Sequence, residues 1–184
     1  MRLYVDLDET LIANVVRGND VVDILPRPGV GWFLRTLAQH GDLWLLTAAH
    51  SSHAERALKK IGIGAKRFKG ILTREDLEPV QEQIAVVLET PGLTDDQRLA
   101  LWNDIKPIAN PGIMFDDFPV GSPMWAMKSK AIGISEQEDK WIQVEPYYPG
   151  KLDRQGLKNA YSEFVARFGD QGLGLGRRVM VSNS

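Results

Sequence analysis

Two aspartates one residue apart, Asp6 and Asp8, follow a short apolar stretch near the start of the chain (residues 3–5, LYV). A buried strand that ends in acids is costly unless a cation, a metal or hydrogen-bond donors compensate the carboxylates. Most pairs of this kind are solvated turns at a protein surface. A functional role for this pair therefore depends on whether the rest of the chain brings further reactive or charged side chains to the same place.

Two further apolar runs also end in polar side chains. Residues 43–46 (LWLL) lead into Thr47, and residues 113–115 (IMF) lead into Asp116 and Asp117. Continuous apolar runs of strand length are typical of parallel strands that are covered on both faces. Because ligands bind at the carboxyl ends of the strands in open parallel sheets, we expect these side chains to meet the first two aspartates in one crevice.

Four carboxylates in one crevice repel each other unless a cation joins them. An all-oxygen set without sulfur suits Mg²⁺, which takes one or two carboxylates together with water and phosphate oxygens. A threonine hydroxyl can hydrogen-bond a phosphate oxygen, and a nearby lysine can neutralise that oxygen. Aspartate can attack phosphorus to give an aspartyl phosphate, and a second carboxylate can protonate the leaving oxygen and then activate water.

The order of these motifs is similar to that of a known family. Residues 6–11 (DLDETL) resemble the first motif, DxDxT, of haloacid dehalogenase-like (HAD) phosphatases. The residues within the motif are similar to those of the RNA polymerase II C-terminal-domain phosphatase branch. Residues 27–34, with RPG followed by FL, resemble the next segment of that branch. Residues 45–48 (LLTA) resemble the second motif and residues 115–117 (FDD) the acidic fourth motif. The resemblance covers about residues 1–168, and the ordered set is more specific than any single motif.

The resemblance implies a role for each matching residue. Asp6 would be the nucleophile and a Mg²⁺ ligand, and Asp8 would be the general acid and base that lends its backbone carbonyl to the metal. Thr47 would bind the transferring phosphoryl group. Asp116 and Asp117 would complete the Mg²⁺ site, although the branch has asparagine at the second of these positions. The implied substrate is a phosphoprotein or a small phosphorylated metabolite or nucleotide.

The family also expects a lysine or arginine upstream of the acidic motif. We assign this third motif to Lys106, because it closes a predicted helix shortly before the strand that leads to the acids. A lysine in the last helical turn also complements the helix dipole, so a purely structural role is an equal alternative. Lys128, Arg74 and Lys69 are the other candidates.

Two other functions remain open from the sequence. The first is a non-catalytic binding module on the same fold, although such members usually lose a catalytic acid and this chain keeps both. The second is a phosphatase that processes nucleotides or nucleic-acid ends. His50 and His53 follow the second strand, where surface or capping roles are more common than ligand roles. Arg27 either clamps a phosphate or fixes its turn, and we favour the turn.

The order of the strands and helices that must position these residues predicts an α/β fold. We expect a Rossmann-like HAD domain over residues 1–168, with a central parallel sheet, helices on both faces and a small cap or none. Residues 12–25 predict a flap-like hairpin, and residues 131–134 a further strand. Residues 63–111 contain two successive helices and predict a family-specific insertion. Residues 169–184 are rich in glycine and predict a flexible tail.

Composition limits the class of protein. The chain has 184 residues, 43% hydrophobic and 25% charged, which suits one globular domain. A net charge of -2 gives no support to nucleic-acid binding driven by bulk electrostatics. The absence of cysteine excludes disulfides and thiolate metal sites, no apolar run approaches a membrane span, and the first residues lack the apolar core of a signal peptide. We therefore expect a cytoplasmic protein, with no oligomeric state favoured.

Overall fold

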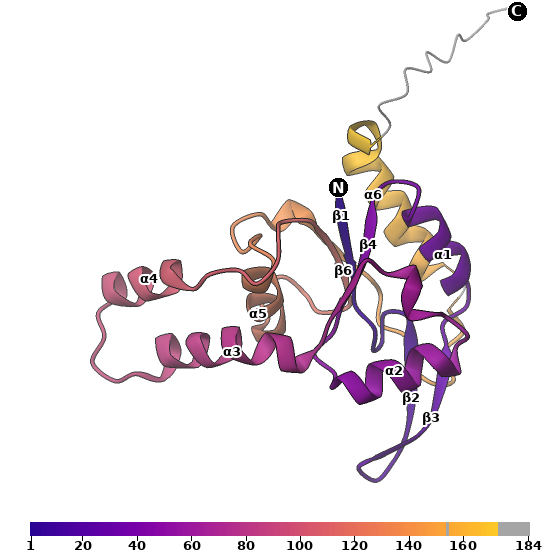
Figure 1. Cartoon of the computed structure of the whole chain (residues 1–184), viewed down its shortest axis with the longest axis horizontal. Helices are drawn as coiled ribbons and strands as arrows, with labels where there is room; N and C mark the ends of the chain where they lie inside the picture. The colour runs from indigo at the N-terminus through magenta and orange to yellow at the C-terminus, as the bar shows by residue number, and fades with distance from the viewer. Residues whose placement is uncertain (154, 173–184) are drawn as a thin grey trace, which may run out of the picture.

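The computed structural model describes residues 1–153 and 155–172. A five-stranded, fully parallel sheet lies at its centre, in the order β5–β4–β1–β6–β7 (Figure 1). Its strands are β1 (Arg2–Val5), β4 (Asp42–Leu46), β5 (Gly70–Leu72), β6 (Ile113–Asp116) and β7 (Trp141–Gln143). The predicted α/β fold with a central parallel sheet is confirmed.

β1 is the middle strand, and its side chains contribute to two separate cores. Leu3 and Val5 pack into the core on one face of the sheet, and Tyr4 packs into the core on the other. Leu3 is in register with Leu43 on one side and Ile113 on the other. Alternation of side chains along a strand therefore explains why this stretch is apolar at every position.

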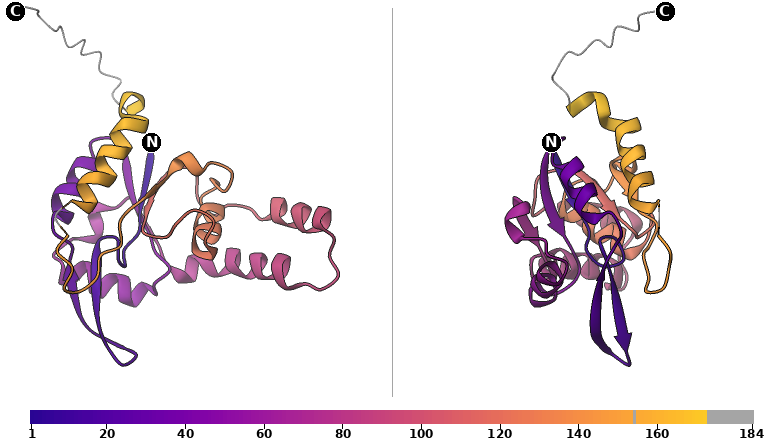
Figure 2. Two further views of the ribbon diagram at one scale, coloured as in Figure 1. Left: turned by 180° about the vertical axis from the view of Figure 1, so that it is seen from behind. Right: turned by 90° about the vertical axis from the view of Figure 1, so that its right-hand side faces the viewer.

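Helices cover both faces of the sheet, as Figure 2 shows from two further directions. One face is packed by α1 (Val30–Leu37), α2 (Ser51–Lys60) and α6 (Gly156–Gly172), and the other by α3 (Arg74–Glu89) and α5 (Pro123–Ala131). Two short 3₁₀ helices, η1 (Ala65–Arg67) and η2 (Glu138–Lys140), precede β5 and β7. The chain thus forms the three layers expected of a doubly covered parallel sheet.

The predicted flap-like hairpin is present as the antiparallel pair β2 (Ile12–Arg17) and β3 (Asp20–Pro26). Gly18 forms its turn with φ +64°, a conformation that glycine adopts without strain. The hairpin extends beyond the carboxyl edge of the main sheet (Figure 1). It therefore stands next to the place where the strand ends meet.

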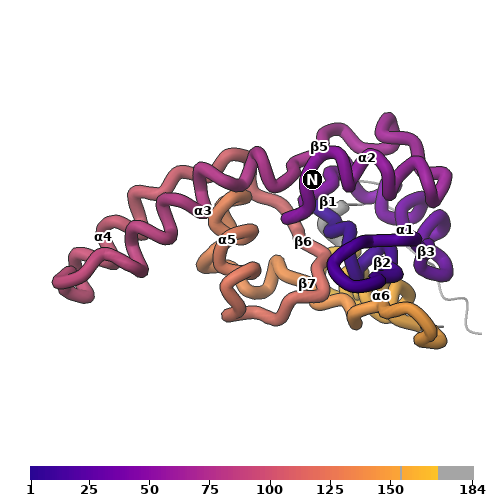
Figure 3. Tube along the Cα trace, turned by 90° about the horizontal axis from the view of Figure 1, so that it is seen from below, coloured from indigo at the N-terminus to yellow at the C-terminus, as the bar shows by residue number. Residues whose placement is uncertain are grey.

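Residues 63–111 include one strand of the central sheet as well as two helices. β5 within this range pairs with β4 and belongs to the central sheet. α3 and α4 (Asp95–Asp104) form a helical hairpin whose far end projects away from the rest of the molecule (Figure 3). Thr94 caps α4, because its side chain accepts a hydrogen bond from the backbone N–H of Gln97.

The strand predicted over residues 131–134 is wrong. Ala131 is the last residue of α5, and Gly133 turns the chain with φ +66°. The fifth strand is instead β7, with Trp141 in register with Met114. Four apolar residues are compatible with either a short strand or the buried end of a helix, so the pattern alone did not distinguish them.

The last helix extends further than the predicted tail boundary. α6 runs to Gly172, so the first four residues of the predicted tail at 169–184 are helical, while 173–184 lie outside the described residues. α6 packs Leu157, Ala160 and Phe164 into the core on the α1 face. Among the described helices, none is long and apolar enough to cross a bilayer.

A buried ion pair ties the turn before α1 to the segment before α6. Arg27 is 1% exposed and pairs with Asp153, and its guanidinium also donates to the backbone oxygens of Thr10 at 3.0 Å and Glu145 at 2.6 Å. These partners of Arg27 within the described residues are all structural. The preference for a turn-fixing role over a phosphate clamp agrees with these contacts.

Asp153→Asn should lower the free energy of unfolding by about 3 kcal/mol near neutral pH, because it leaves a buried guanidinium without its counter-ion. Burial raises the pKa of Asp153, but the hydrogen bond and charge of Arg27, together with the hydrogen bonds from the backbone N–H groups of Gly156 and Gln155, outweigh it and lower that pKa overall. A lowered pKa in the folded state stabilises the fold above the unfolded pKa and is lost as pH falls through the folded value. Urea unfolding between pH 3 and 7 should therefore show a smaller acid-induced loss in the variant. An equal loss in both proteins would contradict this role.

Candidate active site

Three strand ends place polar side chains at one edge of the sheet. Asp6 follows β1, Thr47 follows β4 and Asp116 closes β6. The ladder continues past the named strands, because the Asp6 N–H donates to the Phe115 oxygen at 2.9 Å and the Thr47 N–H donates to the Leu72 oxygen at 2.9 Å. These backbone hydrogen bonds therefore fix the positions of Asp6 and Thr47 at the edge of the sheet.

The loop after β1 brings Asp8 to the same edge. Glu9 has φ +60°, which is uncommon for a residue other than glycine. This turn is held in place by the Tyr147 N–H, which donates to the Glu9 oxygen at 2.7 Å, and by the Leu11 N–H, which donates to the Leu7 oxygen at 2.8 Å. The tight turn is what returns the chain to the crevice before it enters β2.

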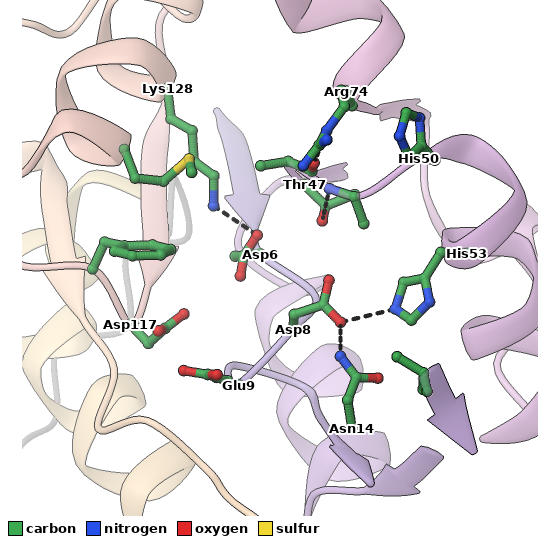
Figure 4. Close-up of a pocket in the computed structure, with 15 residues that line it drawn as sticks. Asp6, Asp8, Glu9, Asn14, Thr47, His50, His53, Arg74, Asp117 and Lys128 are labelled. Atoms are coloured by element: carbon green, nitrogen blue, oxygen red, sulfur yellow. Dashed lines mark hydrogen bonds and ion pairs between the residues drawn. The ribbon is translucent and has the colours of Figure 1, made fainter. Parts of the chain in front are cut away.

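The structure brings four of the predicted residues into one cavity of about 390 Å³, shown in Figure 4. Asp6, Asp8, Thr47 and Asp117 all line it. Asp116 lies beneath the cavity, fully buried, and its Oδ1 accepts a hydrogen bond from the backbone N–H two residues on. The crevice expected from the strand ends is therefore present in the structure.

Lys128 is the cation of this site. Its ammonium group, 1% exposed, donates to Asp6 Oδ1 at 2.7 Å and to Asp116 Oδ2 at 2.6 Å. Burial alone would lower the pKa of Lys128, but the charges of the two aspartates raise it above its usual value. Lys128 is therefore a permanently charged bridge between two buried acids.

The structure places Lys128, one of the stated alternatives, in the crevice and Lys106 outside it. Lys106 is exposed and follows α4, which belongs to the projecting hairpin rather than to the crevice. Lys69 is also exposed, and Arg74 lines the crevice but donates its Nε–H to the Ala48 oxygen. The missed signal was a lysine among the apolar residues of the helix that follows the acidic strand.

Three acids form a cluster suited to a divalent cation. Asp6, Asp116 and Asp117 are all buried, and one oxygen from each lies within 4.8 Å of the others. Thr10 Oγ1 also donates to Asp117 Oδ1 at 3.1 Å, which fixes that carboxylate. The donors are oxygens alone, as Mg²⁺ prefers. The Asp8 side chain is not part of this group.

The electrostatics of the cluster indicate a shortage of positive charge. Burial raises the pKa of Asp6 well above its usual value, even though Lys128 opposes the shift. Burial and the charge of Asp116 likewise raise the pKa of Asp117 to about 6. A divalent cation would lower both values, because an opposite charge favours the ionised form. The residues present therefore fit the Mg²⁺ that the motifs imply.

Asp8 has a different environment from the clustered acids. Its Oδ1 accepts a hydrogen bond from Asn14 Nδ2 at 2.6 Å and lies 2.9 Å from His53 Nε2. Burial raises the pKa of Asp8, but the hydrogen bonds from His53 and Asn14 outweigh it and lower that pKa. The sequence interpretation placed His53 at the surface, and neither neighbour could be linked to Asp8 from spacing. His50, by contrast, is exposed and pairs with Glu75 at 3.0 Å.

A second cavity of about 400 Å³ adjoins the crevice between α3 and α5. The two cavities share Ala48, Arg74 and Met124. The remainder of the second cavity is largely apolar, with Leu77 and Ile84 of α3 among its walls. The crevice is therefore open on one side to a groove that the α3–α4 hairpin helps to build.

Known proteins resemble the chain in two ways. Residues 2–89 match the model of the NLI interacting factor-like phosphatases. The solved structure of the fission yeast RNA polymerase II CTD phosphatase Fcp1-R271A bound to beryllium fluoride is similar at 16% identity and a TM-score of 0.42. That match covers 92% of this chain and 50% of the other, so the chain spans about half its length. No curated protein matches the chain. The part of the chain that carries Asp6, Asp8 and Thr47 is therefore similar to the NLI interacting factor-like phosphatases.

Proposed function

We propose that the chain is a Mg²⁺-dependent phosphomonoester hydrolase that works through a phospho-aspartate on Asp6. The observation that carries this proposal is the position of the Asp6 carboxylate, at the floor of the crevice and bound through Oδ1 to Lys128 at 2.7 Å. Oδ2 is then the oxygen available to attack phosphorus. Asp6, Asp116 and Asp117 would hold the metal, which neutralises phosphate charge when bound.

The reaction consists of two displacements at phosphorus. In the first, Asp6 Oδ2 forms a bond to phosphorus, the ester P–O bond breaks, and Asp8 gives its proton to the departing oxygen. In the second, Asp8 takes a proton from water, the water oxygen bonds to phosphorus, and the P–O bond to Asp6 breaks to release inorganic phosphate. Thr47 Oγ1 and the Lys128 ammonium would hold the phosphoryl oxygens during both steps.

The low pKa of Asp8 suits the second step, in which it acts as a base. For the first step Asp8 must carry a proton. A bound phosphate monoester brings negative charge beside Asp8 and raises its pKa, since like charges disfavour ionisation. The substrate itself would therefore promote the protonated form when it is needed.

Asp8→Asn should lower turnover by about a hundredfold to ten-thousandfold, the usual contribution of general acid–base catalysis. Asparagine keeps the shape of the side chain but can neither give nor take the proton. Because the proposed contact of Asp8 with Mg²⁺ uses the backbone, titration calorimetry should show Mg²⁺ binding within a few-fold of wild type. Loss of metal binding would instead place the Asp8 side chain among the ligands.

The direct test is Mg²⁺-dependent phosphate release from a generic aryl phosphate. Wild-type protein should release phosphate, and chelation of the metal should stop the reaction. A non-catalytic binding module on the same fold would bind a phosphate mimic without releasing phosphate. The presence of both Asp6 and Asp8 favours catalysis over this alternative.

The substrate is proposed to be a phosphoprotein or a small phosphorylated metabolite or nucleotide. The groove beside the crevice leaves room for groups attached to the phosphate. The net charge of -2 disfavours long nucleic acids but not nucleotides. A panel of phosphopeptides, nucleotides and sugar phosphates, compared by kcat/KM, would distinguish these classes.

Residues 1–168 are proposed to form one catalytic domain, with a family-specific insertion between 63 and 111. Both β1 and β7 belong to the same sheet, which supports a single domain. Within the proposed insertion, the α3–α4 hairpin is the part that leaves the body of the fold (Figure 3). Its first helix, α3, lines the groove that adjoins the crevice, which makes the hairpin the segment best placed to influence substrate choice.

A further inference from the structure

The two oxygens of the Asp8 carboxylate have unlike surroundings. Oδ1 accepts the Asn14 amide at 2.6 Å and lies 2.9 Å from His53 Nε2. The other oxygen points toward Asp6 and Thr47, as Figure 4 shows. The hydrogen-bonding groups therefore lie on one side of the carboxylate and the proposed reaction on the other.

The hydrogen bond from His53 has a defined direction. His53 Nδ1 lies 3.3 Å from Arg56 Nη2. A guanidinium only donates, so Nδ1 must accept and the ring hydrogen of neutral His53 lies on Nε2, facing Asp8. His53 and Arg56 are three residues apart on α2, which places them on the same helical face. A neutral His53 is sufficient for this arrangement.

The two donors come from elements outside the main sheet. Asn14 belongs to β2 of the flap-like hairpin, and His53 belongs to α2, which follows the second strand end. Asp8 itself lies in the loop after β1, and its side chain is 29% exposed. Asp8 is not part of a strand of the main sheet, so the orientation of its carboxylate depends on side-chain partners. A proton donor held within a small angular range transfers its proton more effectively than one that rotates.

We propose that His53 and Asn14 are positioning residues for the general acid and base. They hold Oδ1 of Asp8, so that the other oxygen alone gives the proton to the departing oxygen and later receives one from water. This inference rests on the proposed phosphatase function. It adds two residues that neither the motifs nor the strand ends indicate, and it makes the flap-like hairpin and α2 part of the catalytic apparatus.

The test compares two substrates that differ in their need for a proton. A nitrophenyl phosphate releases a stable phenolate without protonation, whereas an alkyl phosphate requires the acid. His53→Ala should lower kcat on the alkyl phosphate by about tenfold to a hundredfold, part of the usual contribution of an acid catalyst. The loss on the nitrophenyl phosphate should be several times smaller, and KM should change little for either substrate.

Two further variants separate positioning from general damage. His53→Gln places an amide donor near the position of Nε2 and should recover most of the kcat on the alkyl phosphate. His50→Ala is the matched control, because His50 precedes the same helix but pairs with Glu75 and not with Asp8. It should leave the ratio of the two activities near the wild-type value. Asn14→Ala should change that ratio in the same direction as His53→Ala.

The outcomes distinguish this inference from the proposed function. If wild-type protein releases no phosphate from either substrate, the proposed function fails. If it is active but His53→Ala lowers both activities equally, or His53→Gln is as impaired as His53→Ala, the positioning role is overturned. Nitrogen-15 NMR gives a readout that does not depend on activity, because His53 should show its proton on Nε2. Protonation on Nδ1 alone would also overturn the inference.

Discussion

Asp6→Asn should lower Mg²⁺-dependent phosphate release by about a thousandfold or more, as expected when a nucleophile is removed. An amide oxygen does not form the phospho-enzyme, while the asparagine side chain has nearly the same size as aspartate. Lys128 keeps its contact with Asp116 at 2.6 Å, so the buried cation retains one anionic partner. The measurement is initial rate with an aryl phosphate at saturating Mg²⁺, together with acid-quenched trapping of the phospho-enzyme.

The control for this variant is Asp20→Asn, a chemically identical change at an exposed position in β3. It should keep the wild-type rate. Thermal unfolding monitored by circular dichroism should show that Asp6→Asn remains folded, so that the lost rate reflects chemistry. Equal activity of wild type and Asp6→Asn, or a trapped phospho-enzyme in the variant, would eliminate Asp6 as the nucleophile.

The positions of the acids could be predicted because they depend on a simple rule of parallel sheets. Each apolar run ended at the last residue of its strand or one residue before it, and side chains at the carboxyl ends of neighbouring strands must share one edge. Asp6, Thr47 and Asp116 follow this rule in the structure. The flap-like hairpin was also predictable, since a glycine turn separated two short runs of β-forming residues.

The identity of the cation could not be predicted in the same way. Lys106 and Lys128 both lie on or beside helices that flank β6, and sequence distance did not indicate which lysine points into the crevice. The structure distinguishes them by burial: Lys128 is 1% exposed among apolar residues, while Lys106 is exposed. A fully buried lysine charge is costly unless it is paired, but burial itself becomes visible only when α5 is placed on the sheet.

The partners of Asp8 were missed for a related reason. His53 lies 45 positions from Asp8 in sequence, and the hydrogen bond between them depends on how α2 leaves the second strand end. Asn14 lies only six positions away, but its approach depends on the tight turn at Glu9. Neither turn geometry nor helix direction follows from periodicity, so contacts made across loops are the least predictable part of such a site.

Lys128→Met should lower the free energy of unfolding by about 3–5 kcal/mol in the absence of divalent cations, because it leaves buried acids without their counter-ion. Methionine retains most of the length and apolar contacts of the lysine stem. Asp6, Asp116 and Asp117 would then face one another with oxygens within 4.8 Å and no cation between them. The variant should also lose most of its phosphatase activity, since the proposed mechanism uses Lys128 on the phosphoryl group.

The matched control for this change is Lys130→Met on the same helix. Lys130 is also buried, but its ammonium lies 5.1 Å from the centre of the Trp102 ring and burial lowers its pKa. Removing that charge breaks no ion pair with the acids of the crevice. Lys130→Met should therefore be close to wild type in stability, which would show that the effect at position 128 arises from its anionic partners.

The pH dependence gives the Lys128→Met experiment its sharpest outcome. In wild type the pKa of Asp117 is about 6, above its value in the unfolded chain, so the folded state binds more protons and this stabilisation is lost as pH rises. Without Lys128, nothing offsets the burial that already raises the pKa of Asp6, so its carboxyl should hold a proton over a wider pH range in the folded state. The destabilisation should thus be larger at pH 8 than at pH 5 in urea unfolding, and Mg²⁺ should restore more stability to the variant than to wild type. Equal destabilisation at both pH values, with no added effect of Mg²⁺, would contradict an acid cluster held together by the lysine.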